Sequence, residues 1–91
     1  MTTLKNEEIV RIAEQEAAAN DIPVQAVTTT ATLDSFGLPA IEVTISIIPG
    51  ASLDFIRDGR SSHVISEVIR QVADQGEERL PIVHFERTRA S

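Results

Sequence analysis

The chain has 91 residues, of which 42% are apolar and 24% charged, and its net charge is -6. These values are typical of one folded domain, here residues 1–91, and argue against a disordered or fibrous chain. The absence of cysteine excludes disulfides, thiolate metal sites and thiol nucleophiles. The acidic balance disfavours nucleic acid as a partner. Without a signal peptide or an apolar run of ~20 residues, we expect a cytoplasmic protein with no membrane contact.

The first half of the chain predicts one helix and two strands. The helix is expected over residues 5–19, where apolar side chains recur at helical spacing: Ile9, Ile12, Ala13 and Ala17. Residues 24–33, VQAVTTTATL, are rich in β-branched side chains and predict a strand. After a turn at residues 34–37, apolar and polar side chains alternate over residues 40–48. This alternation predicts a second strand with one face on a core and the other toward water.

The second half predicts a short helical turn, a long helix and a last strand. The turn follows Ser52, and the long helix is expected over residues 62–75 with one apolar stripe: Val64, Ile65, Val68, Ile69 and Val72. Gly76 is placed where a left-handed residue ends a helix. Residues 79–87 predict the last strand, with Pro81 near its start, where a missing N–H is tolerated.

The expected order of elements is α-β-β-(short α)-α-β, which predicts an α+β fold. We expect a two-layer sandwich in which a three-stranded sheet carries both long helices on one face. The second and last strands are joined through a helix, so they are parallel if they are neighbours. The order of the strands within the sheet stays open.

The uncovered face of this sheet is expected to be polar. The side chains assigned to it are Thr28, Thr30, Thr32, Thr44, Ser46 and His84. Three strands also leave at least one long edge, and an unprotected edge can pair with another chain. We therefore expect a homodimer that is joined through a sheet edge or through this face, with these six residues as the interface candidates.

Most residues that could carry chemistry lie in the stretch FIRDGRSSHVISEVI, residues 55–69. Helical periodicity places His63 and Glu67 opposite the apolar stripe, as a solvent-exposed pair. The alternation of the last strand directs His84 to the far side of the domain. No catalytic motif and no metal-binding set of side chains is present, so we expect no enzyme, no cofactor and no metal.

The N-terminus of the long helix is the one candidate for a small ligand. We expect Ser61 and Ser62 to cap this helix, because a hydroxyl there accepts hydrogen bonds from free N–H groups. Asp58 and Gly59 are expected to turn the chain before the cap. Since free amides and the helix dipole favour an anion, the candidate anion site consists of Arg57, Arg60, Ser61 and Ser62.

Three arginines cluster near the C-terminal end of the chain: Arg79, Arg87 and Arg89. Glutamates are interleaved with them: Glu77, Glu78 and Glu86. This mixture predicts a solvated strand end whose positive charge is neutralised, rather than a recognition patch.

The element order, with a glycine between the short and the long helix, is similar to that of the bacterial type of KH domain. The resemblance implies a nucleic-acid-binding domain in which a turn clamps the backbone of the ligand, here formed by Asp58, Gly59, Arg60 and Ser61. The turn has one glycine where the family has two. Our leading expectation is a small non-enzymatic interaction module that homodimerises or docks on a larger, unidentified protein. The alternative is a KH-like nucleic-acid-binding domain that uses residues 57–62.

Overall fold

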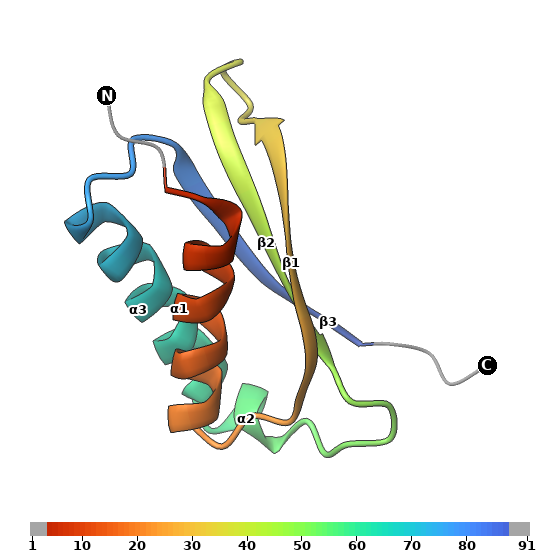
Figure 1. Ribbon diagram of the computed structural model, residues 1–91. Coiled ribbons are helices and arrows are strands. Elements are labelled where there is room, and N and C mark those ends of the chain that lie inside the picture. Colours follow the sequence, from red (N-terminus) through yellow and green to blue (C-terminus); the bar gives the residue numbers. More distant parts are fainter. Residues whose placement is uncertain (1–3, 88–91) are drawn as a thin grey trace.

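The computed structural model describes residues 4–87 of the chain. The elements follow in the order α1 (Asn6–Ala19), β1 (Val24–Leu33), β2 (Pro39–Ile47), α2 (Asp54–Arg57), α3 (Arg60–Asp74) and β3 (Leu80–Arg87). The strands form one sheet, and α1 and α3 cover the same face of it (Figure 1). The predicted α+β fold is confirmed.

The sheet has the strand order β1-β2-β3, so β2 is its central strand. β1 pairs with β2 in antiparallel orientation as a hairpin. β3 pairs with β2 in parallel, from Leu80 opposite Ala40 to Arg87 opposite Ile47. The helices α2 and α3 form the crossover that a parallel pair requires. β1 and β3 are therefore the two edges of the sheet.

A single core fills the space between the sheet and the helices. The alternation along β2 turns every second side chain toward the helices, and these four are fully buried: Ile41, Val43, Ile45 and Ile47. The stripe on α3 meets them with Val64, Val68 and Val72. α1 adds Ile9, Ile12, Ala13 and Ala17, whose small size lets the helix lie close to the sheet. Phe55 of α2 packs against Phe85 of β3, with 5.5 Å between the ring centroids.

The start of α3 differs from the expectation. α3 begins at Arg60, and the residue before it is Gly59, whose φ is 87°. Ser61 and Ser62 therefore lie within the first turn, where neither side chain caps the helix. The expected serine cap is wrong. Instead, the carboxylate of Asp58, just before Gly59, accepts a hydrogen bond from the Arg60 backbone N–H at 3.1 Å.

The chain segment after α3 also differs from the expectation. Gly76, with φ of 89°, ends α3 in the left-handed conformation, as predicted. The next residue, Glu77, is buried, and its carboxylate accepts hydrogen bonds from Arg79 at 2.8 Å and from Leu4 N–H at 2.9 Å. The prediction of a solvated strand end is therefore wrong for Glu77 and Arg79, because both bind the backbone of Leu4 and the Glu77 side chain is buried. Arg89 lies outside the described residues.

Candidate interaction surface

The hairpin formed by β1 and β2 projects past the helices at one end of the molecule (Figure 1). β3 begins only opposite Ala40, so the turn of the hairpin extends beyond it. One Asp34 carboxylate oxygen accepts hydrogen bonds from the N–H groups of Phe36 at 2.8 Å and Leu38 at 2.9 Å. Gly37 takes the positive φ of 80° that closes the turn. These bonds give the projecting loop a defined shape.

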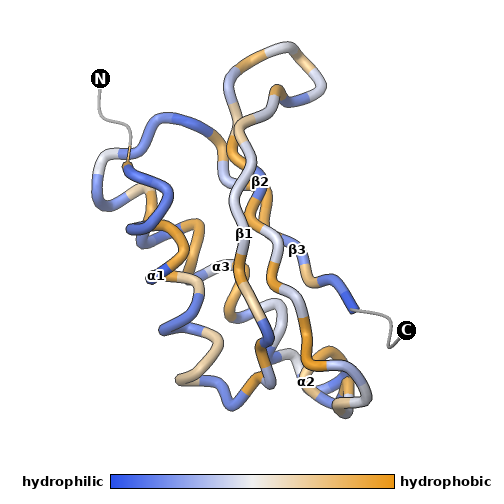
Figure 2. Tube along the Cα trace, turned by 45° about the vertical axis from the view of Figure 1, so that its right-hand side comes forward, coloured by the Kyte–Doolittle hydropathy of each residue, from blue (hydrophilic) through white to orange (hydrophobic). Residues whose placement is uncertain are grey.

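Large apolar side chains are exposed at this end, and we call them the hairpin-end surface: Leu33, Phe36, Leu38, Pro39 and Leu80. Phe36 is 87% exposed and Leu33 63%, while Leu38 and Leu80 are 60% and 50% exposed. Figure 2 shows hydrophobic positions within the projecting loop. Grouped apolar side chains in water mark interaction sites more often than single ones do. The sequence does not single out this surface, although Phe36 and Leu38 are unusually apolar for the turn segment DSFGLP.

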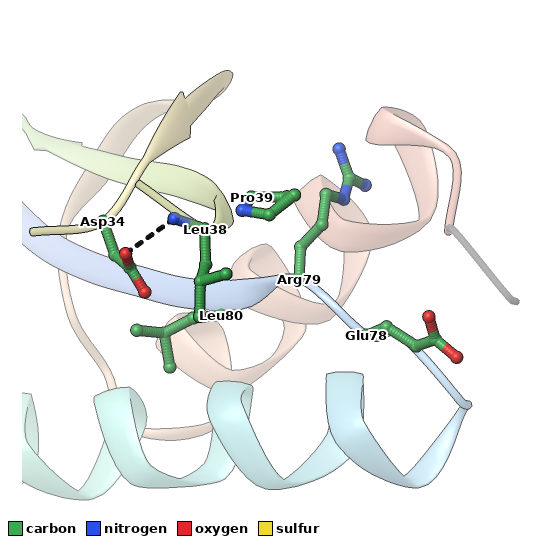
Figure 3. Close-up of a pocket in the computed structure, with 6 residues that line it drawn as sticks. All are labelled: Asp34, Leu38, Pro39, Glu78, Arg79 and Leu80. Atoms are coloured by element: carbon green, nitrogen blue, oxygen red, sulfur yellow. Dashed lines mark hydrogen bonds between the residues drawn. The ribbon is translucent and has the colours of Figure 1, made fainter. Parts of the chain in front are cut away.

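A hollow of about 360 Å³ opens within this surface (Figure 3). It is lined by Asp34, Leu38, Pro39, Glu78, Arg79 and Leu80. Most of its lining surface is apolar, and Asp34 and Glu78 are the two acidic residues that line it. In Figure 3 the Glu78 side chain points away from Leu38 and Leu80. The positive charge of Arg79 is compensated by Glu77, with which it is paired at 2.8 Å. The hollow is therefore apolar inside and acidic at the rim.

The open face of the sheet carries the six expected interface residues, and the sheet register brings them together. Thr28 of β1 lies opposite Thr44 of β2, which in turn lies opposite His84 of β3. The Thr44 hydroxyl and His84 Nε2 are hydrogen-bonded at 2.7 Å, and Glu42 Oε1 is 3.6 Å from the same nitrogen. Thr28, Thr30 and Thr32 of β1 are exposed, whereas Thr44 and Ser46 on the central strand are half-buried.

The four residues of the expected anion site meet at the start of α3: Arg57, Arg60, Ser61 and Ser62. The charge of Arg60 is already paired within the molecule. Arg60 Nε donates to the carboxylate of Asp58 at 2.8 Å, and Arg60 Nη1 donates to the carbonyl of Asn20 at 2.9 Å. Ser61 is buried. Arg60 therefore joins the start of α3 to the end of α1, and Asp58 places a negative charge where the anion was expected.

The polar side of α3 carries a network of ion pairs. Arg70 donates to the carboxylate of Glu67 at 2.8 and 3.1 Å and to that of Asp74 at 2.9 Å. The hydrogen bond from Arg70 lowers the pKa of Glu67. His63 is exposed on the same helix, and within residues 4–87 no hydrogen bond joins it to Glu67. Glu67 therefore pairs with Arg70, through partly exposed i, i+3 contacts, instead of with His63.

Two further features concern the described part of the chain as a whole. Residues 4–87 contain no group of three or more metal-ligating side chains placed to hold a metal ion. Over the same residues, no helix combines the length and the apolar composition that crossing a membrane requires.

Comparison with known protein families, with curated protein sequences and with solved structures finds no match to this chain.

Proposed function

We propose that this protein is a small non-enzymatic interaction module that docks on a larger protein through its hairpin-end surface. The observation that carries the proposal is the exposure of four large apolar side chains at this end of the molecule: Leu33, Phe36, Leu38 and Leu80. Two of them, Leu38 and Leu80, line the hollow. Burying one such side chain on a partner contributes roughly 1.5 to 3 kcal/mol. Phe36, in the turn of the hairpin, has the largest exposed fraction of the four, 87%.

The shape of the loop supports binding without a large loss of conformational entropy. Asp34 holds the N–H groups of Phe36 and Leu38, and the backbone N–H of Asp34 donates to the Leu38 carbonyl at 2.8 Å. A loop that is already ordered loses little freedom when it binds. The hairpin-end surface is therefore preorganised.

The charges at the rim favour one kind of partner. Asp34 and Glu78 stand beside the hollow, and the chain as a whole carries a net charge of -6. Acidic rims attract basic surfaces and accelerate their association. The partner we propose presents an apolar segment that is flanked by lysine or arginine.

The residues in the hollow give no support to an enzymatic function. The two carboxylates that line it are those of Asp34 and Glu78, and Asp34 already accepts two backbone hydrogen bonds. The histidines lie elsewhere, with His63 on the exposed side of α3 and His84 on the open face of the sheet. The residues that line the hollow therefore do not include a nucleophile with a general base within hydrogen-bond reach.

The test is affinity capture of a partner by the wild-type protein and by two matched variants. Phe36→Ser removes the most exposed side chain of the surface, and Ile56→Ser removes a 51% exposed side chain on α2, away from it. We expect Phe36→Ser to weaken binding of the captured protein at least about tenfold, as for a central interface residue. Ile56→Ser should leave it unchanged. Equal binding by both variants contradicts the proposal.

A second candidate function is KH-like nucleic-acid binding through residues 57–62. The observation that favours it is the turn between α2 and α3, where Gly59 takes a φ of 87°. The engagement of Arg60 with Asp58 and Asn20 counts against it. The test is RNA binding at low salt by the wild type and by Arg57→Ala/Arg60→Ala. Salt-sensitive binding that the double variant loses supports this function, and no binding by the wild type dismisses it.

A further inference from the structure

We propose that β1 pairs with β1 of a second copy of this chain, in antiparallel orientation about a twofold axis. Two three-stranded sheets then form one continuous six-stranded sheet. The pairing goes beyond docking through the hairpin-end surface and rests on different groups, namely the free backbone edge of Val24–Leu33.

β1 lacks the features that usually protect an edge strand. Natural edges carry charged side chains, proline or bulges, because an open row of N–H and C=O groups invites pairing. None of the ten residues of β1 is charged, and none is proline or glycine. Its one register irregularity lies at the start, between Val24 and Ala26. From Ala26 to Leu33 the strand follows β2 without interruption, so its outer edge is regular.

The opposite edge of the sheet is protected. β3 contains Pro81, which has no N–H to donate, and it carries His84, Glu86 and Arg87 within its eight residues. These are the features that discourage the addition of a strand. The contrast between the two edges assigns the pairing to β1.

The charge distribution favours a second copy over a different protein. A twofold axis sets each strand opposite itself, so any charge on the edge meets the same charge on the partner. The chain has a net charge of -6, to which β1 contributes nothing. Self-pairing favours an edge without charge, because no like charges then meet across the axis. An edge that binds a basic partner would instead bind it more tightly if it carried carboxylates.

The side chains of β1 also suit this arrangement. With the axis at Thr29, Thr28 lies opposite the partner's Thr30, and the reverse pair is equivalent. Both threonines are exposed on the open face. Threonine pairs across antiparallel strands are favourable, and β-branched side chains pack well on a pleated surface.

The dimer leaves the projecting part of each hairpin-end surface free. Antiparallel pairing directs the two hairpins to opposite ends of the joined sheet, and the helices of both copies lie on the same face. Phe36, Leu38 and Pro39 lie beyond the end of β1, so each copy keeps this part of its docking surface, whereas Leu33 is the last residue of the paired strand. The assembly is thus bivalent for the partner proposed above.

Sedimentation equilibrium of the full chain tests the pairing with two matched double variants. Thr28→Lys/Thr30→Lys sets lysine opposite lysine in two pairs across the axis. Ile82→Lys/His84→Lys is the control, because these exposed residues flank the same two positions of β2, Glu42 and Thr44, from the other side. We expect the β1 variant to weaken dimerisation at least about tenfold, since like charges directly opposite destabilise strand pairs. The control should dimerise like the wild type.

Charge complementation tests the register. Thr28→Asp/Thr30→Asp should also fail to self-associate, whereas an equimolar mixture with Thr28→Lys/Thr30→Lys should form a heterodimer. Hydrogen exchange gives a readout at the strand itself. The β1 amides that point away from β2 should exchange more slowly in the wild-type dimer than in the lysine variant.

Three outcomes overturn the pairing. The first is a wild type that stays monomeric at high micromolar concentration. The second is a dimer that Ile82→Lys/His84→Lys disrupts and Thr28→Lys/Thr30→Lys does not. The third is a mixture of the lysine and aspartate variants of β1 that fails to associate. None of them bears on docking through the hairpin-end surface, because that proposal is tested separately by Phe36→Ser. A failure of one proposal is therefore distinguishable from a failure of the other.

Discussion

Glu77 and Arg79 form an ion pair at 2.8 Å that holds the backbone of Leu4 between its two side chains. Glu77 accepts from Leu4 N–H at 2.9 Å, and Arg79 donates to the Leu4 carbonyl at 3.2 Å. The Glu77 side chain is fully buried, and that of Arg79 is 18% exposed. The pair therefore fastens the segment before α1 to the segment between α3 and β3.

Replacing Glu77 should destabilise the fold. Glu77→Ala leaves the Leu4 N–H and the Arg79 guanidinium without their acceptor, and hydrogen bonds to charged groups contribute roughly 1.5 to 3 kcal/mol. We expect the free energy of unfolding, measured by urea denaturation, to fall by about this amount. Glu78→Ala, at the exposed neighbouring position, is the control and should change it by less than about 0.5 kcal/mol. Similar losses in the two variants would show that Glu77 has no special role.

The same pair predicts a pH dependence of stability. The hydrogen bond from Arg79 lowers the pKa of Glu77 from 4.5 to about 2. Because the folded-state pKa lies below the unfolded value, the stabilisation is fully present above pH ~4.5 and is lost as the pH falls toward ~2. In urea titrations the wild type should lose its advantage over Glu77→Gln within this window. Parallel stability curves for the two proteins would contradict the role of the Glu77 carboxylate.

Phe55 should be the residue that holds α2 in place. α2 has four residues, too few for a helix that is stable by itself, and Phe55 is its buried side chain. Phe55→Ala removes the contact with Phe85 and leaves a cavity, so we expect a loss of about 3 to 5 kcal/mol in the free energy of unfolding. Ile56→Ala, at a neighbouring position that is 51% exposed, should lose much less. If denaturation gives equal losses, α2 is not anchored through Phe55.

Gly59 should be sensitive to substitution because of its backbone conformation alone. Its φ of 87° lies in the left-handed region, and no atom lies within 4 Å of the position of an added Cβ. Gly59→Ala should therefore lower the free energy of unfolding by about 1 to 2 kcal/mol. Gly59→Asn should be milder, because asparagine tolerates this region. If thermal denaturation finds the asparagine variant less stable than the alanine variant, backbone strain is not the cause.

The sequence by itself determined the elements whose pattern is local. β1 was predicted at its observed bounds because its β-branched side chains disfavour a helix. β2 was predicted over residues 40–48, one residue later than observed, because polar and apolar residues alternate along it. The stripe on α3 identified the helix but not its start. Serine is a frequent cap, and the competing hydrogen bond that the Arg60 N–H donates to the Asp58 carboxylate is specific to the geometry of the turn.

Only the tertiary structure decided which edges of the sheet are free, which glutamate is buried and where apolar side chains gather. Glu77 and Leu4 are 73 positions apart, so no local sequence pattern predicts their hydrogen bond. Leu80 joins Leu38 at the hollow because β3 begins beside β2 just where the hairpin continues past it. Such features depend on contacts between distant segments, and local periodicity carries no information about them.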